Sequence, residues 1–315
     1  MTPNIQKLLD TVNEIYPGTV MVRDSGPASG RLLVDRIHQS VLGERLLIEL
    51  EDSTAADFQI GNELLQMLLT LNNIMPQVFF ALSFDDEGLD DQLIQIATRL
   101  HHVVLHAITY QELAKKGILT RETATAYLAG IQDSLTPENG ELDDESLWRL
   151  LTLLDALVFA QFVPEKDFLT TLQTTYPIAY TAAKQLVEPI LQADVTSSRQ
   201  LRRQVVQLFT HVDEVLAKWG KPTINANEFV TVTSVLSKRQ LNQEVRQVFD
   251  IFHSEMLDFQ TKKTAYVGLN KTDRQNSFVL TFSDDESQKP AFFKEIYAMT
   301  VEALFKKLAL PYIER

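Results

Sequence analysis

A stripe of polar residues in a largely apolar segment is the first place where this sequence could do chemistry. Residues 54–71 read TAADFQIGNELLQMLLTL, and the NELLQ stretch contains Asn62, Glu63 and Gln66. In an α-helix, Asn62 and Gln66 lie one turn apart on the same face, with Glu63 beside them. A carboxylate in this position can act as a general base, and the two carboxamides can hydrogen-bond a ligand. We therefore expect this polar stripe to line a binding cleft.

Two histidines with helical spacing are the second candidate. His102 and His106 lie one turn apart in the run RLHHVVLHA, a spacing at which two imidazoles can ligate a metal ion. On a helical wheel they lie opposite the apolar positions, which predicts a solvated helix face. If that face instead looks at the polar stripe, Glu63 and Asp91 could complete a metal site.

The elements that must position these residues form an α+β pattern in residues 1–118. Helix 54–71 is apolar around most of its circumference, as is typical of a buried helix, and Asp52, Ser53 and Thr54 are predicted to cap it. We expect a small, mainly antiparallel sheet packed on this helix. The predicted strands are 19–22, 31–37, 45–50 and 77–82, and the other predicted helices are 4–15, 91–107 and 111–116.

Helical periodicity dominates the chain from Thr120 to about residue 260. No motif recurs at a fixed period, so a helical bundle is the expected arrangement. A β-hairpin (264–270 and 277–282) and a helix (290–308) are predicted to follow. The resulting domains are 1–118, 119–262 and 263–315, and the last is expected to return to the first. The helices predicted in the middle domain are 120–134, 144–162, 165–175, 177–192, 197–219, 225–237 and 239–260.

The composition restricts the function classes. The 315 residues carry a net charge of −13, which disfavours binding to nucleic acid or to an anionic membrane. The absence of cysteine excludes disulfides and thiolate metal sites and fits a cytoplasmic protein. The N-terminal stretch lacks the apolar core of a signal peptide, and no apolar run is long enough to span a bilayer.

The order of a helix, three strands and a helix with polar residues at i, i+1 and i+4 resembles the zincin-like core. It resembles most the small gluzincin-type peptidases of the ImmA/IrrE class, in which an HExxH helix supplies two zinc-ligating histidines and a glutamate that activates water. The resemblance implies a third ligand on the next helix, and in DDQLIQIATRL this position is Asp91, or alternatively Asp90. The positions that match HExxH are Asn62, Glu63, Leu64, Leu65 and Gln66.

This sequence keeps the general-base position of the family and replaces both histidine ligands by carboxamides. A neutral amide oxygen is a poor zinc ligand, because zinc prefers imidazole, thiolate or carboxylate. The resemblance therefore implies a relative of a peptidase that binds no cofactor. The implied binding cleft is lined by Asn62, Glu63, Gln66 and Asp91.

The whole chain also resembles cytosolic proteins of lactic acid bacteria that carry the label IpaB/EvcA family. The resemblance lies in length, charge and layout, with TRLHHVVLHAITYQELAKKGILT as the most characteristic run. It implies a soluble protein and no particular activity.

Three functional hypotheses follow from the sequence. The first is a non-catalytic binding or scaffold protein that holds a peptide or protein partner through the polar stripe. The second is a metal-dependent, peptidase-like hydrolase that uses Glu63 as general base and holds zinc through His102, His106 and Asp91. The third is a helical interaction module, in which NELLQ is an ordinary helix segment whose polar side chains meet another element.

Overall fold

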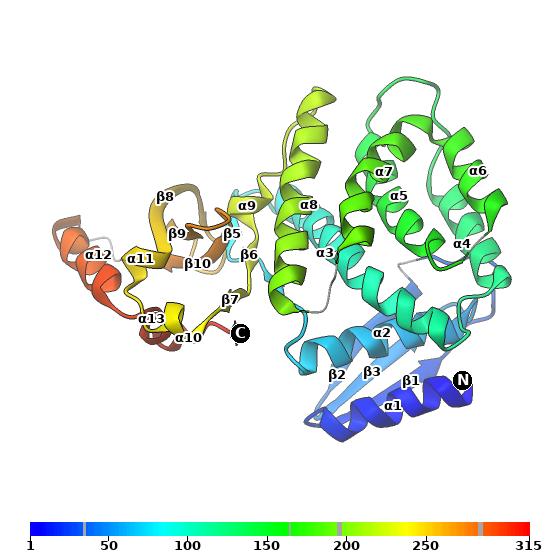
Figure 1. Ribbon diagram of the computed structural model, residues 1–315, viewed down its shortest axis with the longest axis horizontal. Helices are drawn as coiled ribbons and strands as arrows, with labels where there is room; N and C mark the ends of the chain where they lie inside the picture. The colour runs from blue at the N-terminus through cyan, green and yellow to red at the C-terminus, as the bar shows by residue number, and fades with distance from the viewer. Residues whose placement is uncertain (34–35, 164, 194–196, 283–285) are drawn as a thin grey trace. The chain divides into compact units, whose positions relative to one another are not determined.

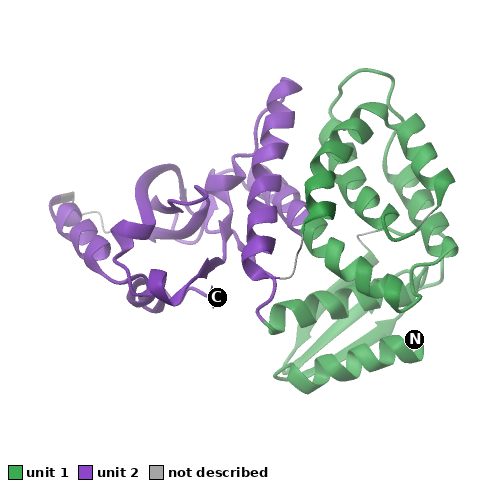
Figure 2. Cartoon of the chain, viewed as in Figure 1, with its two compact units in different colours: residues 1–72, 102–193 green, residues 73–101, 194–315 purple. Residues whose placement is uncertain are grey.

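The computed structural model describes residues 1–33, 36–163, 165–193, 197–282 and 286–315. The fold is α+β, with small sheets and a large helical part, as the sequence predicts. Two compact units divide the chain, and neither is continuous in sequence (Figure 2). Unit 1 comprises residues 1–72 and 102–193, and unit 2 comprises residues 73–101 and 194–315.

Unit 1 begins with a small mixed sheet and two helices. The strands have the spatial order β1-β3-β2, in which β1 and β3 run parallel and β2 and β3 run antiparallel. Helix α1 packs against α2 and β1 (Figure 1). The bounds are α1 Pro3–Ile15, β1 Thr19–Asp24, β2 Ile37–Leu42, β3 Arg45–Leu50 and α2 Ala56–Leu71.

The helical part of unit 1 follows the predicted periodicity closely. Its most buried member is α5, which packs against α6 and α7. Thr120 caps α4 through its side chain, as a threonine at this position is expected to do. The bounds are α4 Arg121–Ser134, α5 Ser146–Ala160, α6 Lys166–Thr175 and α7 Pro177–Gln192.

Helix α3 carries residues of both units. It runs without interruption over Glu87–Lys115, so its first part, 87–101, belongs to unit 2 and its second part, 102–115, to unit 1. The prediction of two separate helices in this stretch is wrong, because no glycine or proline interrupts it between Gly88 and Gly117.

Unit 2 combines the long helix α8 (Ser198–Lys218) with strands and short helices. Its main sheet is antiparallel, with the order β10-β9-β8-β5, and two further pairs are β11-β7 and β4-β6. The strands are β4 Val78–Phe79, β5 Leu82–Ser83, β6 Thr231–Val232, β7 Ser234–Leu236, β8 Phe249–Asp258, β9 Thr264–Asn270, β10 Asn276–Thr281 and β11 Tyr312–Glu314. The short helices are α9 Ala226–Phe229, α10 Lys238–Leu241, α11 Val245–Val248, η2 Glu286–Gln288, α12 Lys289–Ala298 and α13 Val301–Lys307.

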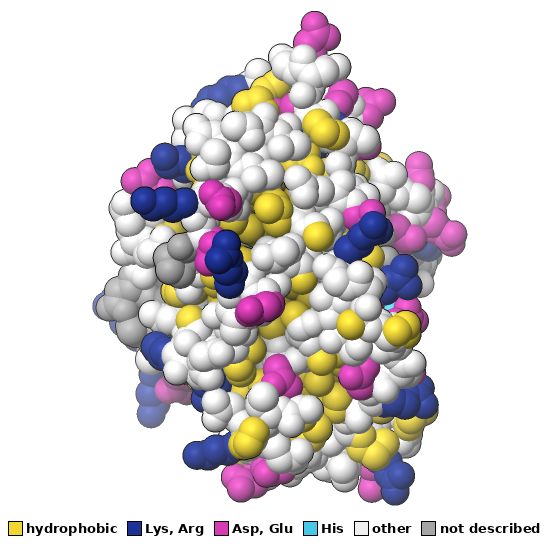
Figure 3. Space-filling model, turned by 90° about the vertical axis from the view of Figure 1, so that its right-hand side faces the viewer, with side chains coloured by type: hydrophobic (Ala, Val, Ile, Leu, Met, Phe, Trp, Pro, Cys, Tyr) yellow, Lys and Arg dark blue, Asp and Glu magenta, His cyan; other side chains and the backbone are white. Residues whose placement is uncertain are grey.

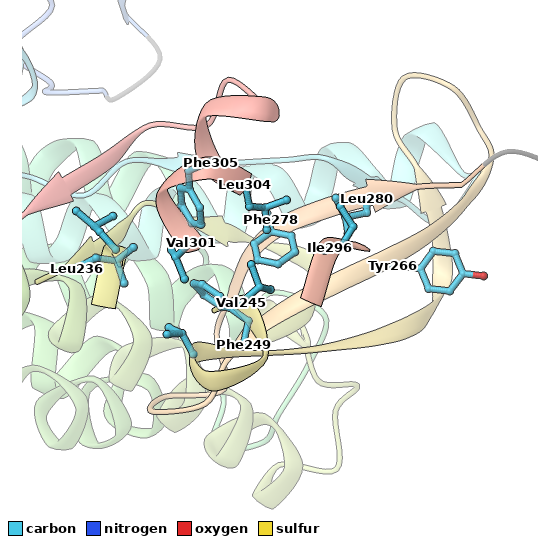
Figure 4. Close-up of a cluster of buried hydrophobic side chains, with 12 residues drawn as sticks. Leu236, Val245, Phe249, Tyr266, Phe278, Leu280, Ile296, Val301, Leu304 and Phe305 are labelled. Carbon is cyan, nitrogen blue, oxygen red and sulfur yellow. The ribbon is translucent and has the colours of Figure 1, made fainter. Parts of the chain in front are cut away.

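An aromatic cluster forms the core of unit 2 between the hairpin and the last helices (Figure 4). The rings of Phe249 and Phe278 lie 5.1 Å apart at 74°, and Phe305 closes the cluster from α13. Gly268 makes this packing possible, because a Cβ atom there would lie 2.1 Å from the Phe278 ring. The close approach of strand and ring accounts for glycine inside β9.

Two helices predicted at 225–237 and 239–260 are wrong. These residues form short helices and the strands β6, β7 and β8, and β8 pairs with both β9 and β5. The run VTVTSV (230–235) is rich in β-branched residues, which favour strands, and its signal outweighs the helical spacing.

One further expectation differs from the structure. The strand predicted at 31–37 instead spans Ile37–Leu42, with residues 34–35 lying outside the described part, and the actual strand is exposed at five of its six positions. The C-terminal hairpin and helices belong to unit 2, in which β9 and β10 complete the sheet of β8 and β5. Within the described residues, no helix is both long and apolar enough to cross a lipid bilayer.

Candidate functional site

The polar stripe of α2 meets a histidine of α3 inside unit 1. Asn62 Nδ2 and Gln66 Nε2 lie 3.2 Å and 3.3 Å from His106 Nε2. Thr109, one turn further along α3, donates from Oγ1 to Asn62 Oδ1 over 2.6 Å. The prediction that His106 lies on a solvated face is therefore wrong, since its side chain is largely buried against α2.

Gly61 allows the helices around this site to approach one another closely. A Cβ atom at this position would lie 2.7 Å from Leu113 of α3 and 2.8 Å from Ile5 of α1. Such distances are too short for carbon atoms in contact, so only glycine fits without displacing a neighbour. The glycine before Asn62 thus places the amide stripe within hydrogen-bond distance of α3.

A single carboxylate on α5 binds the other side of the histidine. Asp155 Oδ1 lies 2.5 Å from His106 Nδ1, and its Oδ2 accepts hydrogen bonds from the hydroxyls of Tyr110, over 3.0 Å, and Tyr127. The His106 and Tyr110 rings stack with centroids 4.6 Å apart. Four helices, α2 to α5, thus contribute side chains to one network.

The hydrogen-bond partners occupy both ring nitrogens of His106. The two amide nitrogens face Nε2, and the Asp155 carboxylate faces Nδ1. Burial alone would raise the pKa of Asp155, but the charge of His106 and the hydrogen bonds from His106, Tyr127 and Tyr110 lower it below its usual value. The carboxylate therefore stays ionised, with three donors around it.

Glu63 points to a different neighbour than the two amides beside it. Its Oε2 accepts a hydrogen bond of 2.6 Å from Nε2 of Gln39 in strand β2. Burial raises the pKa of the Glu63 carboxyl, although the Gln39 hydrogen bond and the charge of His106 act in the opposite direction. Glu63 thus belongs to the margin of the sheet rather than to the histidine network.

The predicted site residues therefore separate into three groups. Asn62 and Gln66 meet at His106, Glu63 meets β2, and Asp91 is an exposed residue of unit 2. The neighbouring Asp90 is buried. Its Oδ2 accepts a hydrogen bond from Ser83 Oγ over 2.6 Å, and its Oδ1 accepts one from the Phe84 amide over 2.9 Å.

The residues around α2 do not fit a zinc ion. The two carboxamides direct their nitrogens at His106, and both ring nitrogens of His106 already have partners. His102 lies next to His106, with ring centroids 5.6 Å apart. Among the residues that the structure describes, no three His, Asp or Glu side chains come together as a possible metal site. The arrangement can hold a fixed imidazole and an ionised carboxylate, and it can position helices.

Sequence reasoning does not identify four members of this network, which are Thr109, Tyr110, Tyr127 and Asp155. Asp155 is the only charged residue between Leu150 and Phe162, inside the run LLTLLDALVFAQF. A lone carboxylate in such a run must be buried with partners, because an unpaired buried charge is costly. The sequence therefore indicates that Asp155 is buried with partners, whereas nothing in it indicates that Tyr127 is one of them.

Comparison of the chain with protein-family models, with curated proteins and with solved structures finds no match. The functional argument therefore depends on the geometry of the two units.

Proposed function

We propose that the chain is a non-catalytic, cytoplasmic binding protein that takes up an extended peptide at the free edge of β2. The proposal keeps the zincin-like resemblance of the first elements and the expectation of a peptide or protein partner. The main supporting observation is that β2 lies at the edge of the β1-β3-β2 sheet and is exposed along almost its whole length.

The exposure of β2 is unusual for a strand with apolar residues. Val41 and Leu42 are 70% and 54% exposed, and the strand pairs with β3 alone among the described strands. An open edge offers unpaired backbone donors and acceptors, and proteins normally blunt such edges because they recruit other strands. Strand addition to an open edge is also a common way to bind an extended peptide.

The register identifies the backbone groups that a peptide would bind. The Glu51 amide donates to Arg36 O, so residues 36 and 51 form a hydrogen-bonded pair of the antiparallel ladder. Such pairs alternate with non-hydrogen-bonded pairs, whose backbone groups turn away from the partner strand. Ile37, Gln39 and Val41 are in the second class, so their N–H and C=O groups point outward.

Glu63 gives this edge a recognition group. The side chain of Gln39 reaches from β2 to Glu63 on α2, so a half-buried carboxylate lies beside the central outward amide of the edge. Its raised pKa follows from burial. A peptide with a lysine or arginine at the matching position would relieve the cost of burying this charge.

The same geometry favours binding over hydrolysis. The hydrogen-bond partner of Glu63 is the amide of Gln39 and not a histidine that could exchange protons with a substrate. The ring nitrogens of His106 are already hydrogen-bonded to Asn62, Gln66 and Asp155. Compared with a hydrolase, a binding edge requires only the exposed backbone of β2 and one adjacent charge.

The test is to select peptides from a random displayed library on the full-length chain and to measure their affinity for variants of β2. Gln39→Pro removes the outward N–H of residue 39 and leaves the ladder to β3 intact, because proline is tolerated on the open side of an edge strand. We expect roughly tenfold weaker binding, the effect of one hydrogen bond and its unpaired acceptor. Gln39→Ala is the matched control, which removes the Glu63 contact and keeps the backbone donor.

The proposal fails if no peptide is selected, or if the selected peptides bind Gln39→Pro and the parent chain equally well. It also fails if the bound peptides protect no amide of β2 from hydrogen exchange. Unfolding curves of Gln39→Pro show whether the sheet is intact. Ser40→Pro removes a ladder hydrogen bond to β3, so its unfolding curve shows how much stability is lost when the sheet is disrupted.

A further inference from the structure

A cavity of about 510 Å³ in unit 2 is lined by an excess of cationic side chains. One wall is helix α8, where Arg199, Arg203, Gln207 and His211 follow one another at intervals of four residues and so share a face. The other walls come from β7, α10, the β9–β10 turn and Arg315. The other lining residues are Arg202, Val206, Thr210, Val235, Gln240, Asn270, Thr272 and Asp273.

Arg202 is the buried member of this group, with 5% of its surface exposed. Its Nε donates to Thr233 O over 3.2 Å and its Nη1 binds Asp273 Oδ2, while the buried Nη2 has no hydrogen-bond partner in the part of the chain that the structure describes. Burial lowers the pKa of Arg202 to about 10. A buried guanidinium with a free donor is costly, and such a group in a native fold needs a reason.

The other arginines of the cavity add to its excess of positive charge. Within the described residues, Arg199 and Arg203 have no ion-pair or hydrogen-bond partner, and Arg315 donates to the neutral Gln240 over 3.2 Å. Partial burial and the like charge of Arg199 lower the pKa of Arg315. Asp273 is the one carboxylate side chain among the lining residues, and it also accepts from the Gln275 amide over 3.1 Å.

Four guanidinium groups around one carboxylate are unexpected in a chain whose net charge is −13. On the face drawn in Figure 3, acidic and basic side chains are interspersed. Like charges repel one another, so a fold that gathers them gains when an anion binds between them.

We propose that this cavity of unit 2 binds a small organic phosphate, with the guanidinium groups of Arg199, Arg202 and Arg203 holding the phosphate. Arginine is the residue best suited to this role, because its planar fork matches phosphate oxygens. The Gln207 and Thr272 side chains supply neutral hydrogen-bonding groups for the remainder of the ligand. A volume of about 510 Å³ lies within the usual range for small-molecule sites and exceeds what one inorganic ion fills.

The site also suits a small molecule better than a macromolecule. The overall negative charge repels a polyphosphate backbone at long range, whereas a small phosphate ester can enter a local positive field. A phosphorylated peptide is the remaining source of the same group and is an arm of the test.

The test is calorimetric titration of the full-length chain, at low ionic strength, with inorganic phosphate, ribose 5-phosphate, ADP and a phosphoserine peptide. We expect saturable binding of ribose 5-phosphate or ADP, and weaker binding of inorganic phosphate. Arg199→Ala combined with Arg203→Ala should weaken binding at least about tenfold, since each removes charged hydrogen bonds to the ligand. Both side chains are exposed, so the fold should tolerate their loss.

The matched control is Arg239→Ala, which removes one exposed arginine of unit 2 outside the cavity. Asp273→Asn is a second control with the opposite sign: it removes the competing carboxylate and should tighten binding. The proposal is overturned if no organic phosphate binds saturably, if only the phosphopeptide binds, or if Arg239→Ala weakens binding as much as the paired substitution.

Discussion

The buried charges of unit 1 and unit 2 differ in how completely they are satisfied. In unit 1, Asp155 accepts hydrogen bonds from three side chains, and His106 uses both ring nitrogens. In unit 2, Arg202 keeps a buried nitrogen that has no hydrogen-bond partner among the described residues, and the adjacent Arg199 and Arg203 have no ion-pair partner among them. Burying a charge is tolerable when its hydrogen bonds are complete. The comparison teaches that the first network holds the fold together, whereas the second group has capacity left for a ligand.

The strongest test of this comparison is Asp155→Ala. The change removes the acceptor that His106 Nδ1 and two tyrosine hydroxyls share, so we expect the free energy of unfolding to fall by about 3–5 kcal/mol. Denaturant unfolding, followed by a spectroscopic signal from unit 1, measures this loss in the free energy of unfolding. Asp133→Ala breaks an exposed ion pair with Arg31 and should cost at most about 1 kcal/mol. Equal losses in the two variants would show that the network is not structural.

The second test is the pH dependence of Asp155→Asn relative to the parent chain. The pKa of Asp155 is lowered in the folded state, so its contribution to stability is present above the unfolded pKa, about 3.9. That contribution is lost as the pH falls through the folded pKa. We therefore expect the stability difference between the two chains to be largest near pH 7 and to shrink below about pH 4. A difference that stays constant with pH would mean that the charge of Asp155 contributes nothing.

Arg202→Met tests the other side of the comparison. Because Arg202 is incompletely hydrogen-bonded, replacing it with an apolar side chain should change stability by less than about 1 kcal/mol, in either direction. The same variant should no longer bind an organic phosphate. Thermal unfolding with and without ligand measures both effects, with Arg203→Met as the exposed counterpart. A loss as large as that of Asp155→Ala would place Arg202 among the structural charges.

The smallest expected effect is that of Glu63→Gln. Burial raises the pKa of Glu63, so ionisation at neutral pH opposes folding, and this cost grows as the pH rises from the unfolded pKa through the folded one. The amide retains an acceptor for Gln39, so we expect a gain of about 1 kcal/mol or less at pH 7 and none at pH 4. Unfolding curves at the two pH values measure it. Destabilisation at pH 7 would indicate that the negative charge has a favourable partner.

The sequence predicts regular, buried elements better than exposed ones. Strands β3 and β9 and helix α7 have the predicted bounds, and helices α4, α5, α6 and α8 differ from them by at most two residues at either end. Their apolar positions recur with the period of the element that buries them. Strand β2 differs from the predicted strand because it is exposed and its central residues are polar, so its position is set by pairing with β3.

The site shows the same limit. The spacing of Asn62 and Gln66 correctly placed both amides on one face, but helical spacing alone could not identify His106 as the residue they meet. Asp155 and Arg202 come from helices far along the chain, and only the packing of those helices decides whether a charge is satisfied. Local pattern therefore identifies candidates, while tertiary contacts decide which of them remain free to act.

The interleaving of the two units also has a consequence for the order in which the chain is synthesised. Ser83 of β5 pairs with Leu257 of β8, so the earlier strand leaves the ribosome long before its neighbour exists. At ordinary rates of translation this interval is roughly ten to thirty seconds. During that time β5 cannot form the pairing that it has in the folded chain, so the sheet of unit 2 is completed only after β8 has been synthesised.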